Sequence, residues 1–310
     1  MRFILTGFVL LLSISAFSQQ LYSRAFGERT NPAILFLHGG PGYNCSTFEV
    51  TTAQTLADAG FYVIVYDRRG EGRSDYSKAK YTFKQSFKDI KSLLKAYEVD
   101  EVALIGHSFG GILATEFALE NKDLVKNVVL VGAPVSLQES FKTIIDSSRQ
   151  IYTDTYDKVN MRYLNKLDNM DSTSLDYAVY CFSHAMQNGF YSTKEQTAEA
   201  KAIFEQFKSD STLINFAAKM TQEANYGFWK NENYTTVDLS TKIKELKAIG
   251  IPVYGLYGKE DGLYSEQQIM DLSELIGSEN LKYLDQCSHS VYIDQQGTFI
   301  EVLKLWLLNN

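Results

Sequence analysis

Short apolar runs alternate with amphipathic stretches along the first half of the chain, from residue 33 onward. The runs cover residues 33–37, 61–66, 102–105 and 128–131, and they are rich in Val, Ile and Leu. Continuous apolar runs of this length are typical of strands buried on both faces, as in parallel sheets. The pattern therefore predicts four strands of one parallel sheet.

The stretches between these runs have helical character. Residues 47–59 end at Gly60, a residue type that often follows a helix, and residues 83–97 carry apolar side chains at helical spacing. Residues 111–120 form a third such stretch directly after the third apolar run. Strands that alternate with helices predict an α/β fold with a mostly parallel central sheet flanked by helices.

The rhythm changes between residues 135 and 240, where Tyr, Phe, Ser and Asn are frequent and no segment has a convincing strand pattern. The alternation of strand and helix patterns then resumes, with strand patterns at 251–257 and 281–284 and helical patterns at 267–276 and 299–308. We therefore expect an α/β core formed by residues 19–134 and 241–310. Residues 135–240 are expected to form an inserted helical cap, or lid, over the sheet.

The first eighteen residues differ from the rest. Arg2 is their only charge, an apolar run covers residues 3–12, and the small residues Ala16 and Ser18 follow. This arrangement predicts a secretory signal peptide over residues 1–18 and an exported protein, periplasmic or secreted. An uncleaved membrane anchor is the alternative, but the apolar run is shorter than the roughly 20 residues of a spanning helix.

Composition adds little that is specific. The chain has 310 residues, a net charge of -7 and 45% hydrophobic residues, as in ordinary globular proteins. The acidic balance does not favour binding to nucleic acid or to anionic lipid. The three cysteines, Cys45, Cys181 and Cys287, allow one disulfide with one thiol left over, or three free thiols.

A G-x-S-x-G pattern surrounds Ser108. Gly106 and Gly110 flank it, an apolar run leads into it and a helical stretch follows. In this setting the glycines permit a sharp turn from strand to helix that exposes the serine oxygen above the sheet. We predict that Ser108 is a nucleophile and that the helix behind it favours developing negative charge.

Serine needs a general base, and the chain offers four histidines. His38 precedes a Gly-rich turn, His107 lies next to the nucleophile and His184 lies in the inserted segment. His289 follows the last predicted strand, at the sheet edge where catalytic groups collect in such folds. We predict that His289 is the base.

The base needs a carboxylate partner. Asp261 follows the strand at 251–257 and precedes a glycine, and Glu260 is its neighbouring competitor. The chain order Ser, Asp, His fits the triad order on this kind of sheet. We predict that Asp261 orients His289.

Two backbone N–H groups should bind the negative oxygen of the tetrahedral intermediate. One is that of Phe109, directly after the nucleophile. The other is expected in the turn 38–42, His-Gly-Gly-Pro-Gly, where missing side chains let a substrate approach the backbone. We favour Gly40 over Gly39 for this second donor.

These residues resemble those of α/β-hydrolase-fold enzymes from Tyr22 to the C-terminus. The His-Gly-Gly-Pro-Gly turn and residues 66–74, Tyr-Asp-Arg-Arg-Gly-Glu-Gly-Arg-Ser, are similar to the prolyl iminopeptidase branch. The resemblance implies a Ser-Asp-His triad, an oxyanion loop at 38–42 and a helical cap. It also implies removal of N-terminal residues, typically proline, from short peptides.

The chain departs from that branch in four respects. His107 stands where the branch often has Trp, Ser288 stands where relatives usually have Gly, and no Trp-x-x-Trp-Glu stretch is found. The first strands of the usual sheet also have no counterpart in the pattern. Related esterases and amidases share the 38–42 motif, so a carboxylesterase or amidase with a small substrate is the alternative. A non-catalytic binding module of the same fold is a third hypothesis, which loss of a triad residue would have favoured.

Residues 222–228 resemble a Glu-Asn-His-Tyr-Phe stretch of prolyl iminopeptidases. The resemblance implies that Glu223 binds the amine of the substrate, and the alternative is a solvated helix glutamate. Glu205 and Glu232 are weaker candidates for a second carboxylate.

No cofactor is expected, because the sequence has neither a His–carboxylate cluster at metal-ligand spacing nor a phosphate-binding Gly loop with lysine. The expected partner is a short peptide or a small ester or amide. Neither nucleic acid nor, once the leader is removed, a stable membrane anchor is expected.

Overall fold

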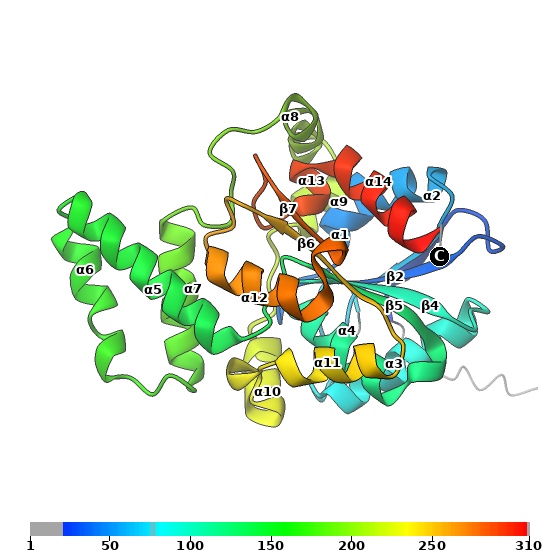
Figure 1. Ribbon diagram of the computed structural model, residues 1–310, viewed down its shortest axis with the longest axis horizontal. Coiled ribbons are helices and arrows are strands. Elements are labelled where there is room, and N and C mark those ends of the chain that lie inside the picture. Colours follow the sequence, from blue (N-terminus) through cyan, green and yellow to red (C-terminus); the bar gives the residue numbers. More distant parts are fainter. Residues whose placement is uncertain (1–20, 75, 77, 309–310) are drawn as a thin grey trace, which may run out of the picture.

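Seven strands form one sheet in the computed structural model, which describes residues 21–74, 76 and 78–308 (Figure 1). The predicted signal peptide lies outside the described residues. The strands are β1 (Ser23–Phe26), β2 (Ala33–Leu37), β3 (Tyr62–Tyr66), β4 (Val102–His107), β5 (Val125–Val131), β6 (Val253–Gly258) and β7 (Leu281–Leu284). Their order across the sheet is β1-β3-β2-β4-β5-β6-β7. All neighbouring pairs are parallel except β1 with β3, which confirms the predicted mostly parallel α/β class.

Strand β1 corrects one expectation. The pattern gave no strand before residue 33, yet Ser23–Phe26 pairs antiparallel with β3, with Ser23 opposite Tyr66. The segment was missed because it lies at the sheet edge and none of its side chains is fully buried. An edge strand of this kind carries no apolar run of its own.

Eight helices, two of them very short, accompany the sheet within the described residues outside 135–239. They are α1 (Ser46–Phe48), α2 (Gln54–Asp58), α3 (Phe83–Ala96), α4 (Phe109–Glu120), α11 (Ser240–Ala248), α12 (Glu266–Ile276), α13 (Val291–Asp294) and α14 (Gln296–Leu307). The single helix expected over residues 47–59 is divided into α1 and α2 by a π-helical turn, Glu49–Ala53.

Successive residues of the strands face two separate apolar cores, as a pleated sheet requires. Leu35 and Leu37 pack with α3, α4, α11 and α12 on one face. Ile34 and Phe36 pack with α2, α13 and α14 on the other. Figure 1 shows the two layers of helices on opposite sides of the sheet. The inner strands β2 to β6 are therefore covered on both faces, which explains their apolar runs.

Residues between β5 and α11 form six α-helices and no sheet strand in the described structure. They are α5 (Leu137–Asp154), α6 (Lys158–Leu164), α7 (Leu175–Gln187), α8 (Ala198–Glu205), α9 (Ser211–Phe216) and α10 (Gln222–Glu232). An isolated bridge between Ser136 and Asp238 closes the base of this segment. We call residues 135–240 the insertion. Figure 1 shows α5, α6 and α7 projecting to one side of the sheet, at the left of the view.

Polar side chains begin several helices of the insertion. Ser136, Ser174, Thr197 and Asp210 each accept a backbone N–H from the first turn of the helix that follows. Side-chain oxygens at this position satisfy N–H groups that have no partner within the helix. The frequent Ser and Asp of this segment therefore define helix starts.

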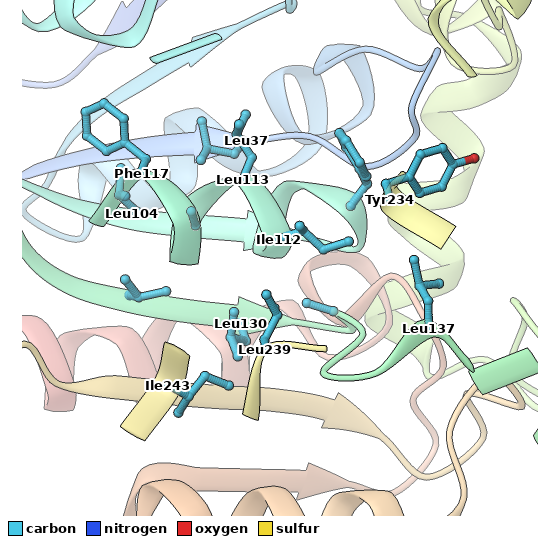
Figure 2. Packing of buried hydrophobic residues seen from close by; sticks show 14 of the residues in the cluster. Leu37, Leu104, Ile112, Leu113, Phe117, Leu130, Leu137, Tyr234, Leu239 and Ile243 are labelled. Atoms are coloured by element: carbon cyan, nitrogen blue, oxygen red, sulfur yellow. The ribbon is translucent and has the colours of Figure 1, made fainter. Parts of the chain in front are cut away.

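Helix α4 is buried along most of its length and fixes the position of Ser108. Ile112, Leu113 and Phe117 are fully buried between the sheet and the neighbouring helices (Figure 2). At the end of α4 that follows Ser108, Leu137 and Tyr234 of the insertion join the same core. The start of α4 is thus held by both the sheet and the insertion.

Candidate active site

Ser108 lies at the sharp turn between β4 and α4. Its backbone has φ 53° and ψ -125°, a left-handed conformation that residues with a side chain rarely adopt. The Ser108 N–H donates to the carbonyl of Val131 on β5, and its own carbonyl accepts from the N–H of Gly111. These bonds hold the strained turn and leave the side chain at the end of the strand, as the G-x-S-x-G pattern predicts.

The two glycines of the pattern are required by close backbone contacts. A Cβ at Gly106 would lie 2.5 Å from Cα of Gly111, and a Cβ at Gly110 would collide with the carbonyl of Leu37. Glycine at 106 therefore lets strand β4 pack closely against helix α4, and glycine at 110 lets α4 approach the end of β2.

His289 and Asp261 are in contact although 28 positions separate them in the sequence. His289 Nδ1 lies 2.8 Å from Asp261 Oδ2, and both side chains are buried. Asp261 follows β6 and His289 follows β7, so adjacent parallel strands bring the pair to one edge of the sheet. With the Nδ1 proton donated to the carboxylate, Nε2 is the nitrogen left for proton transfer.

Glu260, the alternative to Asp261, points elsewhere. Its Oε2 accepts the backbone N–H of Lys194 in the insertion. The Asp261 carboxylate also accepts the N–H of Leu263, which fixes its orientation towards His289.

A second buried carboxylate supports the His289 loop. Asp294 of α13 accepts the N–H of Ser288, the residue before His289, at 2.8 Å. Burial raises the pKa of Asp294 to about 6. Neither this contact nor this carboxylate was anticipated from the sequence, because it depends on how α13 packs against the loop.

Two further histidines near Ser108 are neutral. Burial is the main cause that lowers the pKa of His107 to about 3, and the neighbouring His289 is the second cause. The His107 ring lies 4.8 Å from the His289 ring, and its Nε2 is 3.1 Å from the His289 carbonyl oxygen. The pKa of His38 is also well below its usual value, mainly because the ring is buried and secondly because of the charge of Arg68. His289 is therefore the histidine with a carboxylate partner, whereas His107 and His38 have structural contacts.

The predicted oxyanion residues lie on the same side as Ser108. Gly40 belongs to the turn after β2, and Phe109 is the first residue of α4. A Cβ at Gly39 would be 3.2 Å from Cβ of Ser108, so this turn passes directly beside Ser108. Neither the Gly40 nor the Phe109 N–H is used by a turn or loop hydrogen bond to a backbone carbonyl of the described residues.

A buried ion pair, Arg68 with Glu71, holds residues 38–42, which we call the oxyanion turn after their predicted role. The Arg68 guanidinium donates to the carbonyl of His38 and, at 2.6 Å, to that of Gly39, and it pairs with Glu71. Glu71 in turn accepts the N–H of Gly42 at 2.7 Å. The pair therefore engages both ends of the turn 38–42. The family resemblance pointed to residues 66–74, but not to this function of Arg68 and Glu71.

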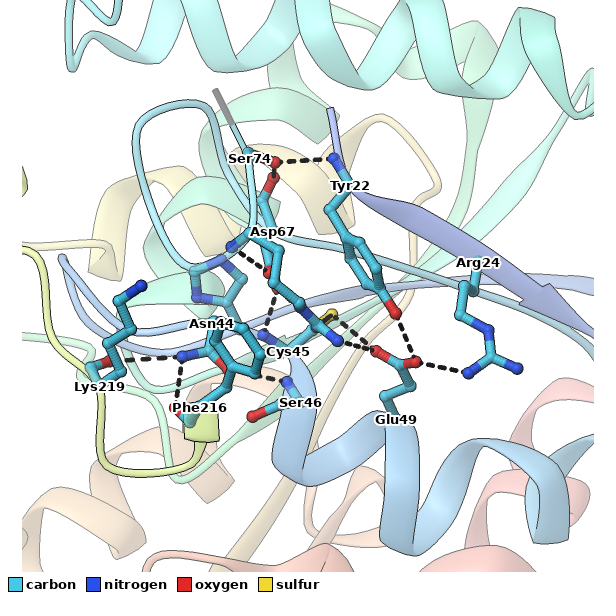
Figure 3. Close-up of polar contacts among 12 residues, drawn as sticks. Tyr22, Arg24, Asn44, Cys45, Ser46, Glu49, Asp67, Ser74, Phe216 and Lys219 are labelled. Carbon is cyan, nitrogen blue, oxygen red and sulfur yellow. Dashed lines mark hydrogen bonds and ion pairs between the residues drawn. The ribbon is translucent and has the colours of Figure 1, made fainter. Parts of the chain in front are cut away.

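A second polar network continues from this turn to the N-terminal strand (Figure 3). Glu49 accepts from the Tyr22 hydroxyl and from the guanidinium of Arg24. Arg73 joins Glu49 to Asp67, whose other oxygen accepts the N–H of Cys45. The network ties β1, the residues on either side of α1 and the loop after β3 together.

The insertion is attached to the same region. The Asn44 side-chain amide donates to the carbonyl of Phe216, at the end of α9, and the Thr221 N–H donates to the carbonyl of Gly42. Figure 3 shows the Asn44 side-chain amide bonded to Phe216 and Lys219 of the insertion. Residues 216–221 are thus anchored on the loop that carries Gly40.

Ser108, His289, Gly40 and Phe109 line one cavity of about 770 Å³. This volume lies within the range of roughly 300–1,000 Å³ that is usual for small-molecule sites. The insertion and the sheet edge both contribute to its wall. The predicted catalytic residues and the insertion therefore meet at a single site.

Glu223, the residue that the resemblance offers for amine binding, is exposed in the first turn of α10. Its neighbours Gln222 and Asn225 line the cavity, and Glu223 is not among the lining residues. Helix α10 buries Ala224 and Phe228, and this orientation turns Glu223 to the solvent.

The weaker candidates do not reach the cavity either. Glu205 is exposed and pairs with Lys208. Glu232 accepts the backbone N–H of Phe83 at the start of α3.

The cysteines and the remaining His, Asp and Glu side chains form no second site in the part of the chain that the structure describes. The three cysteines are free and buried. Among the described residues, no cluster of His, Cys, Asp and Glu is arranged to hold a metal ion. In the same part of the chain, every helix is too short or too polar to cross a bilayer.

Comparison with known proteins agrees with this architecture. The chain matches the family described as "alpha/beta hydrolase fold" over residues 32–296. A proline iminopeptidase of Saccharolobus solfataricus is 24% identical over 312 aligned residues, which cover 96% of this chain and 94% of the relative.

Two solved structures share the fold at low sequence identity. The proline iminopeptidase of Mycobacterium smegmatis is 16% identical with a TM-score of 0.62, over 93% of this chain and 94% of that one. An esterase of Exiguobacterium antarcticum is 17% identical with a TM-score of 0.59, over 93% and 96%. The resemblance inferred from the sequence is confirmed, and the chain belongs to the α/β-hydrolase fold family.

Proposed function

We propose that the protein is a serine hydrolase that cleaves small carboxylic esters or amides through an acyl-enzyme on Ser108. One observation carries the proposal: Ser108, at a strained turn, lines the same cavity as His289, whose Nδ1 is 2.8 Å from the Asp261 carboxylate. A serine nucleophile, a histidine base and an orienting carboxylate are the groups that this reaction needs.

In the first half of the reaction, Ser108 Oγ bonds to the carbonyl carbon of the substrate and its proton passes to His289 Nε2. The carbonyl oxygen becomes negative and accepts hydrogen bonds from the N–H groups of Phe109 and Gly40. The intermediate collapses, the bond to the leaving group breaks and His289 returns the proton to the leaving oxygen or nitrogen. Ser108 is then acylated.

In the second half, water replaces the leaving group. His289 takes a proton from the water, whose oxygen bonds to the acyl carbon, and the bond to Ser108 Oγ breaks. The acid is released and Oγ recovers its proton. Asp261 stabilises the imidazolium in both halves without becoming protonated itself.

Removal of N-terminal proline from peptides is a second candidate function. The similarity to the proline iminopeptidase of S. solfataricus favours it. An aminopeptidase must bind a free ammonium group, for which a carboxylate in the cavity is the usual partner. Glu223, which the resemblance offers for this role, is exposed and is not among the residues that line the cavity, so it gives this candidate no support.

The test is hydrolysis of p-nitrophenyl acetate and of prolyl-naphthylamide, with N-acetylprolyl-naphthylamide as the blocked control. We expect ester hydrolysis that falls by at least about 10³-fold in Ser108→Ala and in His289→Ala. Unchanged rates in either variant would contradict the proposed chemistry. A prolyl-naphthylamide rate well above that of the N-acetylated form would favour the aminopeptidase.

A further inference from the structure

The cavity has apolar walls on the side of α5 and α7. It is lined there by Leu137, Ala178, Val179, Phe182 and Met186, and Ser140 and Ser183 are the polar lining residues of the same two helices. Val179 and Met186 are 51% and 58% exposed, so this wall continues to the mouth of the cavity. A substrate that enters on this side meets hydrocarbon before it reaches Ser108.

The walls formed by α8, α9 and their connections are also apolar. Phe204, Phe207, Ala217, Ala218 and Met220 line the cavity there. In this part of the insertion the Phe216 carbonyl accepts a hydrogen bond from the Asn44 side chain, and the uncharged Gln222 and Asn225 of α10 add polar groups to the lining. Both sets of walls, contributed by separate helices, therefore present mainly carbon atoms.

The charge of the lining decides which substrates fit. Among the described residues, no Asp, Glu, Lys or Arg side chain lines the cavity. His38 and His107 are neutral because burial lowers the pKa of each, and His289 is already paired with Asp261. The lining thus offers neither a free anion for a substrate ammonium group nor a free cation for a substrate carboxylate.

These features favour an uncharged substrate. Burial of an ammonium or carboxylate group without a partner is costly, whereas each buried methylene group is favourable. On the basis of the proposed function, we propose that the substrate is a neutral carboxylic ester whose acyl group is apolar and occupies the walls described above. A peptide with a free N-terminal ammonium group does not fit this lining.

The first arm of the test compares p-nitrophenyl acetate, butyrate and octanoate with prolyl-naphthylamide, using the full chain. We expect kcat/KM to rise by about fourfold for each added methylene group, until the cavity is filled, which corresponds to about 0.8 kcal/mol each. The free amine should be a poor substrate.

The second arm places a charge in the wall. Val179→Asp should lower kcat/KM for butyrate and octanoate by at least about tenfold, while acetate changes little. Val159→Asp on α6 is the matched control, because Val159 is 59% exposed and does not line the cavity. This control should behave like wild type with all three esters.

The outcomes separate this inference from the proposed function. A flat dependence on chain length, equal effects of the two Asp variants, or faster cleavage of prolyl-naphthylamide than of butyrate would overturn the inference alone, provided that Ser108→Ala is inactive. Full activity in Ser108→Ala would overturn the proposed function and the inference together. A rising series with selective loss in Val179→Asp supports both.

Discussion

At the scale of single residues, the candidate site depends on a few side chains that the fold brings together from distant positions. Ser108 adopts a backbone conformation that its flanking glycines make possible, and Asp261 contacts His289 across two neighbouring strand ends. The sequence favoured Asp261 and left its neighbour Glu260 as the competitor. In the structure the loop after β6 turns Glu260 towards Lys194 and Asp261 towards His289.

The orienting carboxylate gives the first prediction. Asp261→Asn should keep the fold but lower kcat for an ester by about 10³–10⁴-fold, because His289 loses the anion that stabilises its protonated ring. Glu260→Gln is the control and should retain most of the activity. Circular dichroism checks that the fold is kept, and steady-state kinetics measure the rates. The reverse order of effects would assign the role to Glu260.

The buried Asp294 gives a prediction about pH and stability. Its pKa is raised from 3.8 to about 6, first of all by burial. Between these values the folded protein keeps a proton that the unfolded chain has released, so this group lowers the free energy of unfolding as pH rises from about 4 to about 6.

The variant Asp294→Asn removes this titration and keeps an oxygen that can accept the Ser288 N–H. Its stability relative to wild type should therefore increase between pH 4.5 and pH 7, by on the order of 1–3 kcal/mol. Urea unfolding at both pH values measures the difference. The same relative stability at both values would show that Asp294 does not titrate in this interval.

At the scale of elements, the oxyanion turn is held from outside rather than by its own sequence. Arg68 and Glu71, in the loop after β3, bind the carbonyls of His38 and Gly39 and the N–H of Gly42. Arg68 also lies over the Phe109 ring, 5.2 Å from its centre. The pair therefore contacts both segments that carry the proposed oxyanion donors.

The loss of this pair gives the third prediction. Arg68→Met should lower kcat by roughly 10²-fold with a smaller change in KM, because a displaced Gly40 N–H no longer meets the oxyanion. Stability should fall as well, since Glu71 is left as an uncompensated buried charge.

Arg69→Met is the control, because Arg69 forms a neighbouring ion pair with Asp89 on α3, away from the turn. It should cost stability with little effect on kcat. Equal kcat values for the two variants would mean that Arg68 has only a structural role.

The elements also show what could be predicted from the pattern. Strands β2 to β6 were found because each contains an apolar run, which follows from burial on both faces. Strand β7, Leu281–Leu284, lies at the other edge of the sheet, is only partly buried and was found from its apolar residues Leu281, Tyr283 and Leu284. Strand β1 was missed because its edge position demands no such run. The π-helical turn at Glu49–Ala53 was not anticipated from the sequence pattern.

At the scale of the whole molecule, the insertion and the sheet edge together enclose the cavity. The position of the insertion over the sheet could be expected from a strand-poor segment between two halves of an α/β core. The lining of the cavity could not be expected, because it depends on how α5, α7, α9 and α10 are rotated. Glu223 illustrates this: one position along α10 separates it from Gln222, which faces the cavity.

Export of the protein is a further proposal at the scale of the whole molecule. We propose that residues 1–18 are removed on export, which leaves Gln19 at the N-terminus. Since Arg2 is the only charge among these residues, the net charge changes from -7 to -8. Intact mass of the protein from its native host should correspond to residues 19–310. A cytosolic product that still begins with Met1 would refute the proposal.

The nucleophile is the claim on which the whole account rests, and covalent labelling tests it most directly. A fluorophosphonate probe should add one phosphonyl group to the wild-type protein, seen by intact mass, and peptide mapping should locate it on Ser108. The His289→Ala variant should react far more slowly, because the serine has lost its base. The Ser108→Ala variant should gain no mass, whereas equal labelling of this variant, or a label mapped to another residue, would contradict the account.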